Sequence, residues 1–222
     1  MKKLAPDFKI TFEQVVHALR SNIRITNPRL TTCEGWTYEQ ALSVLESAYR
    51  IEVERRGREY LQTSDLYTHL EDIAQWLTDG KECGLLLMGG VGNGKTTMLK
   101  ALRSVVKLAK LEFMNDTLYV KYIDSNELTR ICCEDYQSFR KVCNAPLLAL
   151  DDMGAEPVEV KDYGTVRNPI VELIQYRYSE MLPTLISTNL GHDVLKERYG
   201  LRLYDRFREM MHVVVFEEKS YR

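Results

Sequence analysis

With 222 residues, 45% of them hydrophobic and 28% charged, the chain has the composition of an ordinary globular protein, which excludes a disordered or collagen-like one. One main domain with a smaller appendage is expected at this length. The 30 basic and 32 acidic side chains give a net charge of -2, so nucleic acid could bind only through a local positive patch. The longest apolar runs, such as Gly84 to Met88, fall far short of the roughly 18 residues that span a bilayer, and no membrane association is expected.

The amino terminus and the cysteines favour a cytoplasmic protein. Met1-Lys2-Lys3 begins like a signal peptide, but the polar stretch Pro6 to Lys9 interrupts any apolar segment after it. The cysteines are odd in number and show neither Cys-x-x-Cys nor His-x3-His spacing, so we expect reduced thiols and no zinc site or structural disulfide. They are Cys33, Cys83, Cys132, Cys133 and Cys143.

The first 60 residues are predicted to be helical. Thr11 to Gln14 and Thr37 to Gln40 both fit a capping box, and each precedes apolar residues at helical spacing. The second of these helices ends in a charged run, Glu52 to Glu59, which is typical of a solvated helix end and linker. We therefore predict a helical amino-terminal region over residues 1–60, which could bind a partner, and a second domain over residues 61–222.

After this boundary, helical and extended segments alternate. Leu66 to Leu77 has a helical apolar stripe, closed by Asp79-Gly80. The segments that follow are predicted as strand 84–88, helix 95–109, strand 118–124, helix 127–134, strand 147–151, helix 169–181, strand 184–187, two short helices and strand 213–216. Such alternation predicts an α/β fold in which a parallel sheet is covered by helices on both faces.

Residues Gly89 to Thr96 fit the phosphate-binding pattern G-x-x-x-x-G-K-[ST], placed between a buried strand and a helix. The glycines let successive backbone N–H groups point at phosphate oxygens, and the helix adds the positive end of its dipole. Lys95 is expected to reach the β- and γ-phosphates, Thr96 to bind Mg²⁺ and Thr97 to contact the α-phosphate. The predicted nucleotide-binding residues are Gly89, Gly90, Val91, Gly92, Asn93, Gly94, Lys95, Thr96 and Thr97.

A second motif, Leu147 to Asp152, is typical of a buried strand that ends in two carboxylates, as in Walker B. Asp151 is expected to anchor Mg²⁺ through its waters, and Asp152 to polarise the attacking water. Many ATPases have glutamate at the second position. Because aspartate is one methylene shorter, the water must lie closer or the rate falls. An acidic turn that caps a strand is the alternative interpretation.

Two further segments contain polar groups that could take part in the chemistry. Asn189, which follows the next strand, could orient water against the γ-phosphate, although Ser-Thr-Asn after a strand is usually a loop. The segment Gly200 to Arg208 places arginines on several sides of a short helix. Arginine binds phosphate oxygens bidentately, but composition alone favours a solvated helix face there.

Five segments together resemble the AAA+ ATPases of the DnaC and DnaI helicase-loader and IstB transposition-helper group: Gly89 to Thr97, Leu147 to Gly154, Arg177-Tyr178, Ser187 to Asn189, and Asp205-Arg206 followed by Ser220 to Arg222. The resemblance covers roughly residues 65–222. It implies a P-loop NTPase fold with an AAA+ core, and a homo-oligomer in which Arg206 is an arginine finger acting across a subunit boundary. Arg222 could approach nucleotide or a neighbouring subunit, while core packing or an ion pair would explain Arg177 and Tyr178 equally well.

The resemblance implies a protein that binds and hydrolyses ATP with Mg²⁺, a DnaC-like loader acting on single-stranded DNA and a replicative helicase. An IstB-like transposition helper, an ATP-gated adaptor with little hydrolysis, and a small-molecule kinase remain alternatives. The partner stays open, because residues 1–60 match no known helicase-binding domain. DNA could pass the segment between the second and third strands, with base stacking on its aromatic residues. The residues concerned are Lys121, Arg130, Arg140 and Lys141, with Tyr122, Tyr136 and Phe139.

Overall fold

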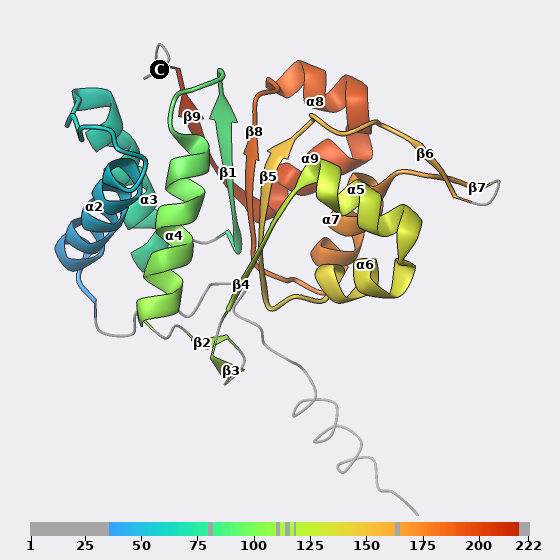
Figure 1. Ribbon diagram of the computed structural model, residues 1–222, viewed down its shortest axis with the longest axis horizontal. Coiled ribbons are helices and arrows are strands. Elements are labelled where there is room, and N and C mark those ends of the chain that lie inside the picture. Colours follow the sequence, from blue (N-terminus) through green and yellow to red (C-terminus); the bar gives the residue numbers. More distant parts are fainter. Residues whose placement is uncertain are drawn as a thin grey trace, which may run out of the picture.

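The computed structural model describes residues 36–79, 82–109, 112–113, 116–117, 119–162 and 165–217 (Figure 1). A five-stranded sheet in the order β4-β5-β8-β1-β9 lies at its centre. The strands are β1 (Gly84–Gly89), β4 (Val120–Asp124), β5 (Leu147–Met153), β8 (Thr184–Thr188) and β9 (Met211–Phe216). All four pairs of neighbouring strands are parallel, which confirms the predicted sheet.

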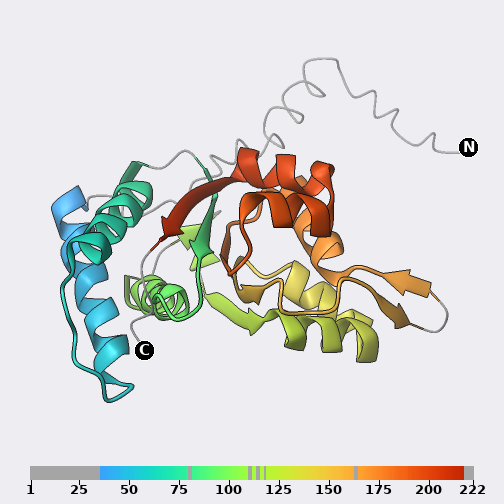
Figure 2. The ribbon, with the colours of Figure 1, turned by 90° about the horizontal axis from the view of Figure 1, so that it is seen from above.

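Helices cover both faces of the sheet, as predicted (Figure 2). Alternate residues of β1 face opposite layers: Leu85 and Leu87 pack in one cluster, Leu86 and Met88 in the other. The first face carries α2 (Tyr38–Glu54), α3 (Ser64–Asp79) and α4 (Lys95–Ala109). The second carries α5 (Ser125–Glu134), α6 (Tyr136–Cys143), α7 (Pro169–Ser179), α8 (His192–Tyr199) and α9 (Leu201–Met210).

The helix α2 begins with the predicted capping box. Thr37 Oγ1 accepts a hydrogen bond from the Gln40 amide, and Gln40 Oε1 accepts one from the Thr37 amide. The buried side chains of α2, among them Leu45 and Tyr49, share one cluster with α3 and α4. The described part of the amino-terminal region therefore packs on the domain that follows it. The boundary near residue 60 stays a prediction, and the helix expected after Thr11 lies outside the described residues.

Several elements differ from the sequence prediction. Two short antiparallel hairpins were not predicted, β2 (Glu112–Phe113) with β3 (Asp116–Thr117), and β6 (Val160–Asp162) with β7 (Thr165–Arg167). The second hairpin projects from the body of the molecule (Figures 1 and 2). The helix α7 ends two residues earlier than predicted, since Met181 adopts a φ of 50° that no right-handed helix allows.

Within the described residues, four cysteines are free thiols: Cys83, Cys132, Cys133 and Cys143. Cys33 lies outside them. No group of three or more His, Cys, Asp or Glu side chains in the described ranges could hold a metal ion. None of the helices in those ranges combines the length and apolar character that crossing a bilayer requires.

Candidate nucleotide-binding site

Three strands bring the predicted site residues to one edge of the sheet. Because β8 lies between β1 and β5, the carboxyl ends of all three meet there. The P-loop, residues 89–96, follows β1, while Asp151 and Asp152 lie near the end of β5, and Asn189 follows β8. A crevice at the carboxyl ends of parallel strands is where ligands bind in folds of this class.

The P-loop conformation requires glycine at two positions. Gly89 has a φ of 137°, and a Cβ atom there would lie 2.1 Å from the Phe216 carbonyl oxygen. Gly94 has a φ of 95°, and a Cβ atom there would lie 2.4 Å from the Tyr49 hydroxyl. The positive φ and the close contact of a Cβ atom thus both disfavour any residue other than glycine at these two positions. The side-chain amide of Asn93 also donates to Phe216 O (2.6 Å), which links the loop to the end of β9.

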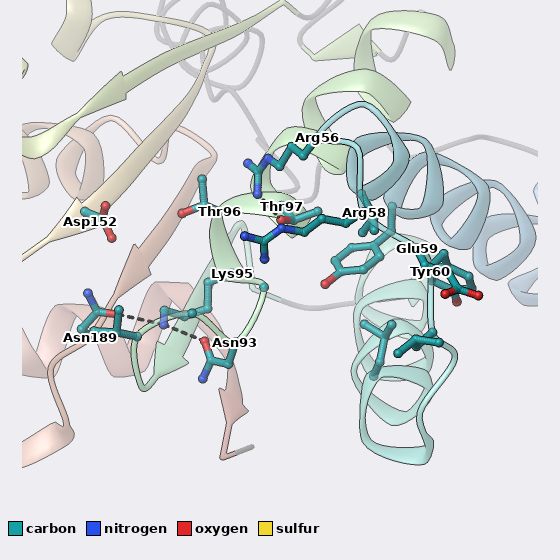
Figure 3. Close-up of a pocket in the computed structure, with 17 residues that line it drawn as sticks. Arg56, Arg58, Glu59, Tyr60, Asn93, Lys95, Thr96, Thr97, Asp152 and Asn189 are labelled. Atoms are coloured by element: carbon teal, nitrogen blue, oxygen red, sulfur yellow. Dashed lines mark hydrogen bonds between the residues drawn. The ribbon is translucent and has the colours of Figure 1, made fainter. Parts of the chain in front are cut away.

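Lys95 is only 4% exposed, and its ammonium contacts oxygens of the loop. It donates to the carbonyl oxygens of Gly89 (2.8 Å) and Gly90 (2.6 Å), and to the side-chain oxygens of Asn93 (3.0 Å) and Asn189 (2.9 Å). Figure 3 shows the two amide contacts. Burial lowers the pKa of Lys95, against the opposing influence of Asp152 and Asp151. The hydrogen bonds of a desolvated cation to charged phosphate oxygens would be stronger than those that Lys95 forms with these neutral oxygens.

Asp151 is buried and accepts hydrogen bonds from three hydroxyl groups. Its Oδ1 accepts from Thr96 Oγ1 at 3.1 Å and from Ser187, and its Oδ2 accepts from Tyr122. Burial, together with this carboxylate, raises the pKa of Tyr122. Thr96 and Asp151 therefore adjoin as predicted, and a hydroxyl beside a carboxylate is a donor set that fits Mg²⁺. The parts played by Ser187 and Tyr122 at Asp151 were not predicted.

Asp152 points toward the cavity in front of the P-loop and is exposed (Figure 3). Its φ of 53° places it in the left-handed region, which aspartate tolerates better than most residues. The backbone amide of Asp152 donates to Ser187 Oγ at 2.9 Å. Ser187 thus holds both carboxylate residues, Asp151 through its side chain and Asp152 through its backbone.

The cavity has a volume of about 1030 Å³, ample for a small-molecule ligand. One wall contains Asp152, Asn189 and the P-loop from Val91 to Thr97. The opposite wall was not predicted: the charged run is exposed from Glu54 to Glu59, as its interpretation as a solvated helix end and linker implies, but part of it also lines the cavity. This wall comes from α2, α3 and their linker, and consists of Tyr49, Val53, Arg56, Arg58, Glu59, Tyr60, Leu61 and Leu66.

Comparison with known proteins agrees with this arrangement. No protein-family model matches the chain. The replicative helicase loader DnaI of Bacillus subtilis (strain 168) is 32% identical over 139 residues, 60% of this chain and 42% of DnaI. The chain is similar to the DnaC and DnaI group of AAA+ proteins, as its motifs predicted. It spans less than half the length of this relative.

Two solved structures show the same fold. A DnaI crystal structure matches with a TM-score of 0.56 at 22% identity, over 81% of this chain and 93% of the DnaI chain. The DnaC helicase loader matches with a TM-score of 0.52 at 22% identity, over 71% of this chain and 93% of the DnaC chain. The predicted α/β fold of the P-loop type, a parallel sheet covered by helices on both faces, is thereby confirmed.

Arg206 does not line the cavity. It lies in α9, with its guanidinium 5.0 Å from the centre of the Tyr178 ring, and the Tyr178 hydroxyl donates to Glu209. Its Nη1 is buried and has no hydrogen-bond partner within the described part of the chain. A finger that acts on a neighbouring subunit must lie away from the cavity of its own chain, as here, and its action there stays a prediction.

Arg177, the other half of the Arg177-Tyr178 signature, is a core residue with no solvent exposure. Its guanidinium donates at 2.8 Å to Cys143 O, Ala145 O and Thr184 Oγ1, and also to Pro183 O. Burial lowers the pKa of Arg177 to about 9. For Arg177, core packing is therefore the explanation that applies, since neutral oxygens accept these hydrogen bonds and no ion pair of Arg177 is present within the described ranges.

The residues proposed for DNA contact have mixed surroundings. Phe139 is only 1% exposed and packs in the core, so the expectation that it stacks on bases is wrong. Tyr122 is half-buried and its hydroxyl is bonded to Asp151. Tyr136 is 40% exposed, but the Arg167 guanidinium lies 4.3 Å from its ring centre.

Ser220 to Arg222, the last residues on which the resemblance rests, lie outside the described residues.

Proposed function

We propose that this chain binds ATP with Mg²⁺ and hydrolyses it, as a cytoplasmic helicase loader of the DnaC type that forms homo-oligomers and acts on single-stranded DNA and a replicative helicase. One observation carries the ATPase proposal: Lys95, Asp152 and Asn189 line one cavity, next to the Thr96-Asp151 pair. The identity to DnaI, a replicative helicase loader, supports the choice of a helicase as partner.

In the proposed bound state, Lys95 exchanges the Gly89 and Gly90 carbonyl oxygens for β- and γ-phosphate oxygens. The exchange is favourable because the hydrogen bonds of an ammonium to a charged oxygen are roughly twice as strong as neutral ones. The residues from Val91 to Thr97 would surround the phosphates at the start of α4.

Thr96 and Asp151 would hold Mg²⁺, which when bound neutralises phosphate charge and orients the γ-phosphate. Asp151 would act mostly through coordinated waters, since its two oxygens already accept three hydroxyl groups. Tyr122 and Ser187 therefore fix the direction of this carboxylate from the neighbouring strands.

For hydrolysis, Asp152 would accept a proton from the attacking water, while Asn189 orients that water against the γ-phosphate. Arg206 of a neighbouring subunit would stabilise the charge that develops on the transferred phosphoryl group. The Ser187 contacts hold the segment that carries Asp152 in place.

Steady-state ATP hydrolysis by the purified chain, with and without single-stranded DNA, tests this function. We expect DNA-stimulated turnover, and loss of both ATP binding and turnover in Lys95→Ala. Tight ATP binding by Lys95→Ala would contradict the P-loop assignment. Pull-down experiments with this chain as bait distinguish two functions. Capture of a replicative helicase supports a loader, and capture of a transposase supports an IstB-like transposition helper.

An ATP-gated adaptor with little hydrolysis is a second candidate. The observation that favours it is the shorter acid at position 152, where aspartate reaches one methylene less far than glutamate. A single-turnover assay with DNA and helicase present distinguishes the two. ATP that stays bound and uncleaved under these conditions supports the adaptor.

A further inference from the structure

Two arginines enter the nucleotide cavity from the linker between α2 and α3. Arg56 and Arg58 extend toward the first turn of α4 (Figure 3). Gly57 lies between them with a φ of 68°, and its amide donates to Glu54 O at 2.8 Å, which ends α2 in a tight turn. This turn aims the end of α2 at the P-loop.

Arg56 is bound to the P-loop helix by a neutral group. Its Nη1 donates to Thr97 Oγ1 at 2.7 Å, although the two residues are 41 positions apart. Within the described ranges, Arg56 forms no ion pair. The preceding Arg55 differs, because it pairs with Glu52 at 2.9 Å and does not line the cavity.

A guanidinium has five N–H donors and binds the oxygens of a phosphate bidentately. Thr97 is a single hydroxyl acceptor, so it satisfies only part of this capacity. An arginine without a carboxylate partner, on the wall of a cavity that contains a P-loop, has the chemistry of an anion-binding residue.

We propose that Arg56 binds the α-phosphate of the nucleotide within its own chain. Thr97, its present partner, is the residue expected beside the α-phosphate, while Lys95 serves the β- and γ-phosphates. This inference rests on the proposed nucleotide binding. Since Arg56 belongs to the turn that ends α2, nucleotide phosphate would connect that helix directly to the P-loop.

Dissociation constants for ATP and ADP, measured by calorimetry on the full chain, test the assignment. We expect Arg56→Gln to raise the dissociation constants for ATP and for ADP by the same factor, roughly tenfold or more, because both nucleotides contain the α-phosphate. Arg56→Lys keeps the positive charge but not the planar guanidinium, so it should lose less nucleotide affinity than Arg56→Gln. Glutamine keeps N–H donors but its amide is two bonds nearer the backbone than the Arg56 Nη1 that contacts Thr97, so thermal unfolding midpoints show whether the lost affinity comes from lost structure.

Arg55→Gln is the matched control and should bind both nucleotides like the wild type. Wild-type affinity in Arg56→Gln, or weakening of ATP alone, would overturn the α-phosphate assignment. Failure of the proposed function looks different, since wild-type protein would then bind no nucleotide, or Lys95→Ala would bind it unchanged. Thermal unfolding without nucleotide should give the same midpoint for the Arg55 and Arg56 variants.

Discussion

The Lys95 ammonium and the Asn189 side-chain oxygen are joined by a hydrogen bond of 2.9 Å, although 94 positions separate them in the chain. The bond connects the P-loop to the residue that follows β8. The amide thus lies beside the cation that is expected to bind the γ-phosphate.

We predict that Asn189→Ala binds ATP with an affinity within a few-fold of wild type but hydrolyses it roughly 100-fold more slowly, because the attacking water loses its orienting group. Asn189→Asp should instead weaken ATP binding, since a carboxylate would pair with Lys95 and repel phosphate. Calorimetric dissociation constants and turnover rates check both variants. Equal behaviour of the two would contradict this role for the amide.

Asp152 allows a test in which the backbone is undisturbed. Asparagine tolerates the φ of 53° as well as aspartate does, so Asp152→Asn should fold normally. We expect it to bind ATP like the wild type and to lose about 100-fold or more in hydrolysis, since it cannot accept the proton.

The companion variant Asp152→Glu should raise the single-turnover rate, because the added methylene carries the carboxylate toward the water. Glutamate adopts a positive φ less readily than aspartate, and a loss of roughly 1 kcal/mol in the free energy of unfolding is expected. Hydrolysis at the wild-type rate in Asp152→Asn would exclude this carboxylate as the base.

Arg177 is predicted to support stability rather than turnover. Arg177→Met would take the Arg177 donor from the buried carbonyl oxygens of Cys143 and Ala145 and leave Pro183 O with only the Leu148 amide, which should lower the free energy of unfolding by roughly 3 kcal/mol. Urea unfolding measures this loss. The control Arg130→Met removes an exposed i,i+4 pair with Glu134 and should cost less than about 0.5 kcal/mol. Similar losses in both variants would show that the buried contacts contribute little.

Arg206→Ala should retain ATP binding, because the residue does not line the cavity of its own chain, and should lose roughly 10³-fold in hydrolysis. Arg208→Ala, at an exposed position of the same helix, is the control. Mixing Arg206→Ala with Asp152→Asn protein should restore part of the activity at interfaces that combine an intact finger with an intact acid. Once size-exclusion chromatography has established co-assembly, inactive mixtures would argue against action between subunits.

Local patterns in the sequence were sufficient to predict much of the fold. The helix α4 extends from Lys95 to Ala109 as predicted, because the P-loop fixes its beginning and an apolar stripe follows. The β6–β7 hairpin escaped prediction, since each of its strands has only three residues and shows too little alternation to be distinguished from a loop. The helix α6, which Asp135 caps, was not predicted.

The site could be predicted where one motif contains it. Lys95 and Thr96 lie in a single contiguous pattern, and Asp151 follows a recognisable buried strand. The partners of Asp151 could not be predicted, because they depend on the strand order that places β4 and β8 on either side of β5. Arg56 was missed for a related reason, since only the packing of α2 on α4 brings it to Thr97.

The strand β8 contacts groups at both ends of the sheet. At its start, Thr184 accepts from Arg177, and near its end Ser187 holds both carboxylate residues of β5. Thr188 donates to Met153 O, and all five residues of the strand are buried. In a scan of every single substitution under selection for function, these five positions should tolerate few changes, with even serine–threonine exchange penalised at position 187.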